Sequence, residues 1–154
     1  MKHARGAVWA TVFGVAGVLH FAQPKPFDGL VPEGLPGSPR FYTYASGVAE
    51  LALSAVIAGC TAVDAAQTKS EGAAELAGER RQGADGGDPP TSIAASLLQD
   101  WVAPATAGFL LAVWPGNIKM AWDWRRKPWG KRSVAFARVP LQVPMVLSAA
   151  KLGR

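Results

Sequence analysis

The sequence predicts an all-α integral membrane protein that crosses the bilayer four times as a four-helix bundle. Four long apolar stretches alternate with short polar ones along 154 residues, and only 18% of the residues are charged. Each stretch has close to the 17 to 25 residues, roughly, that a membrane-spanning helix needs. None of them alternates apolar and polar residues as a barrel strand does. We therefore expect a single membrane domain over residues 1–154.

The first two spans are expected at residues 6–22 and 42–63. The first follows a basic start and ends in His20-Phe21-Ala22-Gln23-Pro24, without the small-residue cleavage pattern of a signal peptide. We therefore interpret it as a retained helix. The second is rich in alanine, serine and glycine, and these small side chains favour close approach of a neighbouring helix.

The other two spans are expected at residues 102–122 and 134–150. Ser92–Trp101 is expected to begin the third helix outside the apolar core. Pro115-Gly116 should bend or break this helix near its far end. Pro140 and Pro144 lie in the fourth span, where neighbouring helices can compensate for the lost backbone hydrogen bonds.

The connections between the spans differ in character. Residues 23–41 contain five prolines, which predicts a stiff, extended loop rather than a helix. Residues 64–92 form a polar insert, in which Thr68–Arg81 could make a short exposed helix. The glycines, aspartates and prolines of Gly83–Pro90 predict a flexible linker.

The net charge of +5 is interpreted as a membrane-surface feature rather than as a sign of nucleic-acid binding. Five basic residues are concentrated between the third and fourth spans, where they can meet anionic lipid headgroups. They are Arg125, Arg126, Lys127, Lys131 and Arg132. Four tryptophans near them predict an interfacial belt or, alternatively, a stacking surface for a quinone-like ring: Trp114, Trp122, Trp124 and Trp129.

Several cofactors are excluded by the lack of ligands. Cys60 is the only cysteine, so an internal disulfide, a redox pair and a cysteine-ligated iron–sulfur cluster or zinc site are impossible. Cys60 is expected to pack as a small hydrophobe. His3 and His20 are the only histidines, and His3 lies in the tail, so no axial pair for haem is expected. The cofactor class that remains open is a quinone.

The functional-site candidates are polar residues inside the apolar stretches, because such residues are costly in a bilayer. They are His20, Ser46, Glu50, Asn117, Arg138 and Gln142. At about 1.5 Å per residue, the four antiparallel helices bring them all into one leaflet, beneath the loops at 23–41 and 123–133. Ser46 with Glu50, and Arg138 with Gln142, are four residues apart and thus share a helix face.

An isolated buried charge is far costlier than a pair, which predicts an ion pair between Glu50 and Arg138. This pair could fix helix register only, form a ligand or proton site, or serve in binding a partner protein. His20 is expected near the interface, with a hydrogen bond to a headgroup or a loop. Pro115 frees a backbone carbonyl one turn earlier, for which Asn117 is a candidate donor.

The combination of short motifs resembles the DoxX-like family of small four-helix membrane proteins. The residues that carry the resemblance are Gly17–Phe21 with Pro24, Val31-Pro32, Leu35-Pro36, Tyr44–Glu50, Trp114–Asn117 and Arg138–Gln142. They cover most of the chain outside the insert and the tails.

The resemblance implies an accessory subunit or scaffold, associated with a quinone-linked or redox-stress membrane complex, rather than an enzyme in its own right. Protein partners in or on the membrane are therefore expected, and the plasma (inner) membrane of a bacterium is the expected location. Two alternatives stay open. One is a quinone-reactive oxidoreductase component in which Glu50 and His20 transfer protons. The other is a membrane assembly chaperone or small carrier.

Overall fold

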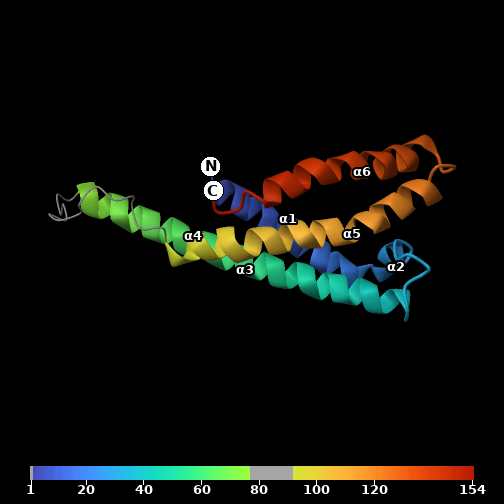
Figure 1. Cartoon of the computed structure of the whole chain (residues 1–154), viewed down its shortest axis with the longest axis horizontal. Helices are drawn as coiled ribbons and strands as arrows, with labels where there is room; N and C mark the ends of the chain where they lie inside the picture. Colours follow the sequence, from blue (N-terminus) through green and yellow to red (C-terminus); the bar gives the residue numbers. More distant parts are fainter. Residues whose placement is uncertain (1, 77–91) are drawn as a thin grey trace.

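The computed structural model describes residues 2–76 and 92–154, and the secondary structure in these two ranges is entirely helical. Four long helices account for most of it (Figure 1): α1 (Lys2–Ala22), α3 (Pro39–Leu76), α5 (Ala103–Asp123) and α6 (Trp129–Ala149). Shorter elements join them: α2 (Pro24–Asp28), α4 (Ile93–Leu97) and the π-helical turn η1 (Leu98–Val102), which leads directly into α5. The expected four long helices are present, and the described residues add the short elements α2, α4 and η1 to them.

Three helical segments are long and apolar enough to cross a membrane: Lys2–Ala22, Pro39–Ala74 and Ile93–Asp123. They contain the first three expected spans. The fourth expected span corresponds to α6, which begins five residues earlier than expected, at Trp129. Its basic first turn, together with Arg138, Gln142 and two prolines, makes it less apolar than the other three.

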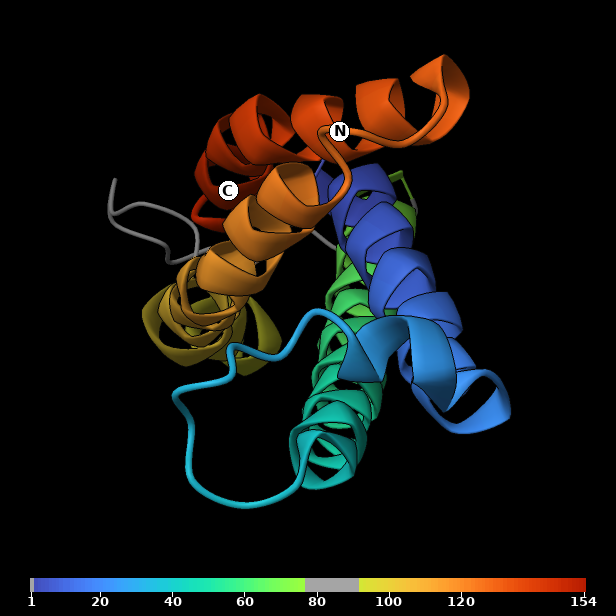
Figure 2. The ribbon, with the colours of Figure 1, turned by 90° about the vertical axis from the view of Figure 1, so that its right-hand side faces the viewer.

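The long helices pack as two hairpins, α1 with α3 and α5 with α6 (Figure 2). Glycines permit the close contact within the first hairpin. A Cβ atom added to Gly47 would lie 2.8 Å from His20 Cβ, and one added to Gly17 would lie 3.1 Å from the Gly47 carbonyl oxygen. The expected small-residue contact is thus confirmed at Gly47. Gly59, on the same helix, faces open space instead.

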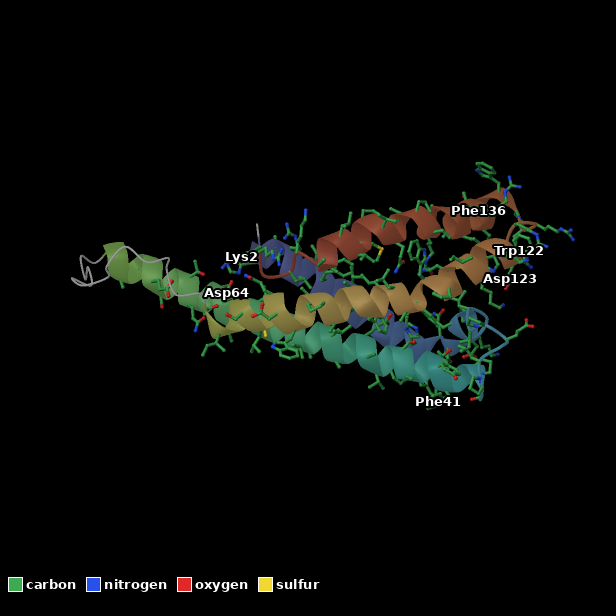
Figure 3. The ribbon with its side chains drawn as sticks, in the orientation of Figure 1. Lys2, Phe41, Asp64, Trp122, Asp123 and Phe136 are labelled. Atoms are coloured by element: carbon green, nitrogen blue, oxygen red, sulfur yellow. The ribbon has the colours of Figure 1, made fainter. Side chains whose placement is uncertain are left out.

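The two hairpins meet in an apolar core near the chain termini. Its buried members come from α1, α3, the α4–α5 segment, the end of α6 and the C-terminal turn: Trp9, Ala10, Phe13, Ile57, Leu98, Val102, Ala103, Leu110, Ala149 and Leu152. Cys60 packs against this cluster, as expected for a small hydrophobe. At the same end, buried Asp64 accepts hydrogen bonds from Lys2 Nζ at 2.9 Å and Ser92 Oγ at 2.7 Å. Figure 3 places Lys2 and Asp64 at the end opposite Trp122 and Asp123.

The helical segment of the third expected span, α4 with η1 and α5, begins after Ser92, as predicted. The Ser92 hydroxyl caps α4 by accepting a hydrogen bond from Ala95 N at 3.0 Å. Ala94, Ala95 and Leu98 of this segment are buried against the other helices, and its expected position outside the apolar core of the bilayer stays a prediction. Of the expected bend or break at Pro115-Gly116, the break does not occur, since α5 continues through Pro115 to Asp123.

The polar insert is partly an extension of α3. This helix continues without interruption to Leu76, so Thr68–Leu76 belongs to α3 rather than to a separate short helix. An amphipathic second span and a helix-favouring insert join because no proline or paired glycines stand between them. The rest of the insert, 77–91 with Gly83–Pro90, lies outside the described residues.

The proline-rich loop is not fully extended, because Pro24–Asp28 forms the short helix α2, with proline at its first position. Asp28 ties this helix to α3. Its carboxylate accepts from Arg40 Nη2 at 2.8 Å and from Thr43 Oγ1 at 2.7 Å. These bonds, Arg40 first, hold the pKa of the Asp28 carboxyl below its ordinary value. The loop is therefore anchored to the α1–α3 hairpin while Asp28 is ionised.

The same loop also contacts the other hairpin. Lys119 Nζ on α5 donates to the Gly29 carbonyl at 3.2 Å. Gly116 admits the Leu30 backbone, because a Cβ atom there would lie 3.2 Å from the Leu30 carbonyl oxygen. The segment between α2 and α3 thus bridges the hairpins at the end far from the core (Figure 2).

Candidate functional site

A cavity of about 290 Å³ lies between the two hairpins, beneath the proline-rich loop. Its walls come from α1, α3, α5 and α6, and α2 with the following loop contributes Phe27, Leu30, Val31 and Leu35. All six residues that the sequence indicates as site candidates line this one cavity: His20, Ser46, Glu50, Asn117, Arg138 and Gln142. The structure therefore brings together residues that are more than 120 positions apart at the extremes, His20 and Gln142.

His20 and Glu50 form a pair of ionisable side chains at the centre of the cavity. His20 Nδ1 lies 3.0 Å from Glu50 Oε2, and the two residues are only 7% and 9% exposed. The same nitrogen lies 2.8 Å from the Ala16 carbonyl oxygen. One N–H cannot point well at both acceptors, and Glu50 Oε2 has no hydrogen bond of good geometry among the described residues. We therefore assign the hydrogen bond to Ala16 and a close ionic contact to Glu50.

Two predictions about these residues were wrong. The first is that His20 hydrogen-bonds a headgroup or a loop: it bonds the Ala16 carbonyl of its own helix, and its contact with the 23–41 loop is ring stacking on Phe27, with centroids 3.8 Å apart. The second is the ion pair between Glu50 and Arg138, since the ionic neighbour of Glu50 is His20. The physical reason is helix pairing. The Gly17–Gly47 contact brings α1 against α3, whereas α6 packs on α5 and presents Arg138 from the other hairpin.

A second polar group on the cavity wall joins α5 to α6. Asn117 Nδ2 donates to Gln142 Oε1 at 3.0 Å, and Gln142 Nε2 donates to the Leu110 carbonyl at 2.5 Å. Gln142 is 3% exposed, so these bonds satisfy an amide that would otherwise be costly to bury. Asn117, one candidate donor for the carbonyl freed by Pro115, does not serve it, because its amide donates to Gln142 instead.

The rest of the lining is mostly apolar and aromatic. Trp9, Phe13, Phe109 and Met145 line the cavity, whereas the four tryptophans expected to offer a stacking surface do not. A quinone-like ring in this cavity would therefore meet phenylalanines and Trp9. Sequence reasoning missed Thr43 as a lining residue. Its position, three residues before Ser46 on the same helix face, is the signal that could have identified it.

This arrangement suits a small amphipathic molecule. The cavity volume is at the lower end of the range for ligand pockets, roughly 300–1,000 Å³. A carboxylate–imidazole pair faces it from one hairpin, and a guanidinium and two amides face it from the other. Arg138 has no carboxylate within ion-pair distance among the described residues. The cavity thus offers an acceptor, Glu50, and a donor, Arg138, that do not neutralise each other directly.

Comparison with known proteins gives a family but no activity. Residues 9–75 and 93–153 match the family described as Domain of unknown function (DUF8561). The chain belongs to this family. No curated protein and no solved structure matches it. All six candidate residues lie within the matched segments, whereas residues 76–92, the later part of the polar insert, lie outside them.

Proposed function

We propose that this protein is an accessory subunit or scaffold of the bacterial plasma membrane, which crosses the bilayer four times and holds an amphipathic molecule in its central cavity. The observation that carries this proposal is the convergence of polar residues from all four long helices on one cavity with otherwise apolar walls. Polar groups inside membrane helices are costly and usually serve a site.

The distribution of side chains on α6 supports a fourth crossing. Arg138 and Gln142 line the cavity. On the opposite side of the same helix, Phe136, Val143 and Leu147 are 51%, 48% and 58% exposed. A helix with one face on a polar cavity and the other on lipid has a low mean apolarity and can still span the bilayer.

Site-directed labelling tests the fourth crossing. Membrane-impermeant labels on cysteines introduced at Gly37 and Gly130 should report one side of the membrane, and labels at Lys69 and Gly153 the other, in a Cys60→Ser background. Four crossings require this alternation because the two pairs lie at opposite ends of the long helices. Finding Gly153 on the same side as Gly130 would remove α6 as a span.

The resemblance to DoxX-like proteins supports the accessory role. The motifs that carry the resemblance include all six candidate residues that line the cavity, so the similar segments coincide with the candidate site. Such a subunit would work within a quinone-linked or redox-stress complex, together with protein partners that supply the reaction.

A second candidate function is favoured by the contact between His20 and Glu50. A quinone carbonyl takes up a proton for each electron that it accepts. The Glu50–His20 pair, when it carries a proton on the carboxyl or on the imidazole, can deliver that proton and regain one from the solvent. In this alternative, a partner subunit supplies the electrons and the cavity holds the quinone ring. Quinone-dependent turnover by the isolated chain with an artificial electron donor would favour this alternative over the accessory role.

Ligand occupancy of the cavity is tested by purification in a mild detergent, followed by mass spectrometry of the extracted small molecules and of copurified proteins. The parent chain should retain an amphipathic molecule at a defined ratio. Ala16→Leu, which adds a side chain to the cavity wall, should reduce that ratio by about tenfold, because a lost or blocked contact of 1.4 kcal/mol has this effect.

A matched control is available on the same helix. Ala7 is exposed and does not line the cavity, so Ala7→Leu should retain the molecule at the ratio of the parent chain. Equal amounts of every extracted molecule from the parent and from Ala16→Leu would show that the cavity holds none of them.

A further inference from the structure

The connection between α5 and α6 carries a dense cluster of positive charge. The residues Arg125, Arg126, Lys127, Lys131 and Arg132 are defined here as the basic loop surface. Arg126, Lys127 and Lys131 are exposed. The chain contains no aspartate or glutamate after Asp123, and the Asp123 carboxylate accepts from Lys119 Nζ at 2.6 Å. None of the five cations forms an ion pair with a carboxylate among the residues that the structure describes.

Two arginines of this surface are held on tryptophan rings. The Arg125 guanidinium lies 4.3 Å from the centroid of Trp122, and Arg125 Nη1 also donates to the Trp122 carbonyl at 2.6 Å. The Arg132 guanidinium lies 5.0 Å from the centroid of Trp129. Both tryptophans are largely exposed, at 65% and 73%. One such pair stands at each end of the loop, so the cations are positioned in advance of any ligand.

Two of the cations at the other end of the long helices, Lys2 and Arg5, form contacts within the protein. Lys2 pairs with Asp64, and Arg5 Nη1 donates to the carbonyls of Lys151 and Arg154 at 2.7 and 3.2 Å. Figure 3 shows Trp122 and Asp123 at the far end from these contacts. The basic loop surface thus places five cations within eight residues at one end of the helices, next to exposed tryptophans.

We propose that the basic loop surface docks the headgroups of anionic phospholipids and selects them over zwitterionic ones. Exposed tryptophans at the ends of spanning helices lie at the level of the headgroups. The guanidinium and ammonium groups beside them then meet the lipid phosphates, which guanidinium binds well through paired hydrogen bonds. Nucleic acid is disfavoured as the occupant, because the surface adjoins helix faces that carry exposed apolar side chains, such as Ile118 and Phe136.

The test uses the full chain reconstituted in phosphatidylcholine vesicles that contain increasing fractions of phosphatidylglycerol with brominated acyl chains. Bromine quenches tryptophan fluorescence at short range, so enrichment of the anionic lipid shows as quenching above that expected from the bulk composition. Brominated phosphatidylcholine in the same vesicles gives the reference. The triple variant Arg125→Gln, Arg126→Gln and Lys127→Gln keeps all tryptophans and should lose the enrichment by at least about tenfold, since each cation near the surface contributes roughly 1 kcal/mol.

Two further variants separate specific from general charge effects. Lys69→Gln, Lys151→Gln and Arg154→Gln together remove the same charge from the opposite end and should leave the enrichment unchanged. The double variant Arg125→Lys with Arg126→Lys keeps the charge and should retain most of the enrichment. It shows that changing these positions does not by itself unfold the protein, so that a loss in the triple variant can be assigned to the missing charge. Equal enrichment in the parent and in the triple glutamine variant overturns the proposal. So does equal loss in the opposite-end variant, or abolition of the enrichment by a short DNA duplex bound to the same surface.

Discussion

Replacing His20 by leucine is expected to lower the free energy of unfolding in detergent by about 3 kcal/mol, because it leaves the Glu50 carboxylate buried without its basic neighbour. His20 Nδ1 is 3.0 Å from Glu50 Oε2, and both side chains are about nine-tenths buried. The double change His20→Leu with Glu50→Leu should recover most of this loss, since a buried ionic pair can be replaced by apolar side chains at little cost. Denaturant titration monitored by circular dichroism gives both values.

Arg138 supplies the matched comparison for this cycle. It lines the same cavity but lies outside ion-pair distance of Glu50. The coupling free energy between Glu50→Leu and Arg138→Leu should therefore be within about 0.5 kcal/mol of zero in the ligand-free protein. A large coupling to Arg138 together with none to His20 would contradict the arrangement described here and restore the pair that the sequence predicts.

The second large effect is expected at Gly47. Gly47→Leu should destabilise the protein by about 1–3 kcal/mol or more, because a side chain there has no space between α1 and α3. A Cβ atom alone would lie 2.8 Å from both His20 Cβ and Phe21 Cε2. The substitution should also displace His20, so that a ligand held in the cavity is lost together with stability. Thermal unfolding and extraction of the bound molecule measure the two consequences.

Gly59→Leu is the matched control for this change. Gly59 lies on the same helix, and nothing lies within 4 Å of an added Cβ atom. Because glycine is about 1 kcal/mol less favourable than alanine inside a helix, this variant should be as stable as the parent or more so. Similar losses of stability at Gly47 and Gly59 would mean that the two helices do not meet at Gly47.

Local properties of the sequence determined the helical character of the chain and the positions of its polar residues along the helices. An apolar run of spanning length predicts a helix however the helices pack together, because backbone polar groups in lipid must form their hydrogen bonds within the same segment. Three of the expected spans correspond to helices that are long and apolar enough to cross a membrane. Four-residue spacing likewise put Ser46 with Glu50, and Arg138 with Gln142, on common helix faces, and all four line one cavity.

The tertiary structure alone decided which polar residues meet. The position of a residue along its helix sets its depth in the bilayer. By depth alone, both Arg138 and His20 were possible partners of Glu50. Which helices pack side by side depends on where small residues on two helices face each other and allow close contact. Gly17 and Gly47 bring α1 against α3 and so bring His20 to Glu50, while α6 pairs with α5 and joins Gln142 to Asn117. The sequence also placed the site beneath the 23–41 loop, but it did not identify Leu30 and the other loop residues that cover the cavity. Asp28 and Lys119 position the loop through contacts between the loop and two different helices, and only the tertiary structure shows these contacts.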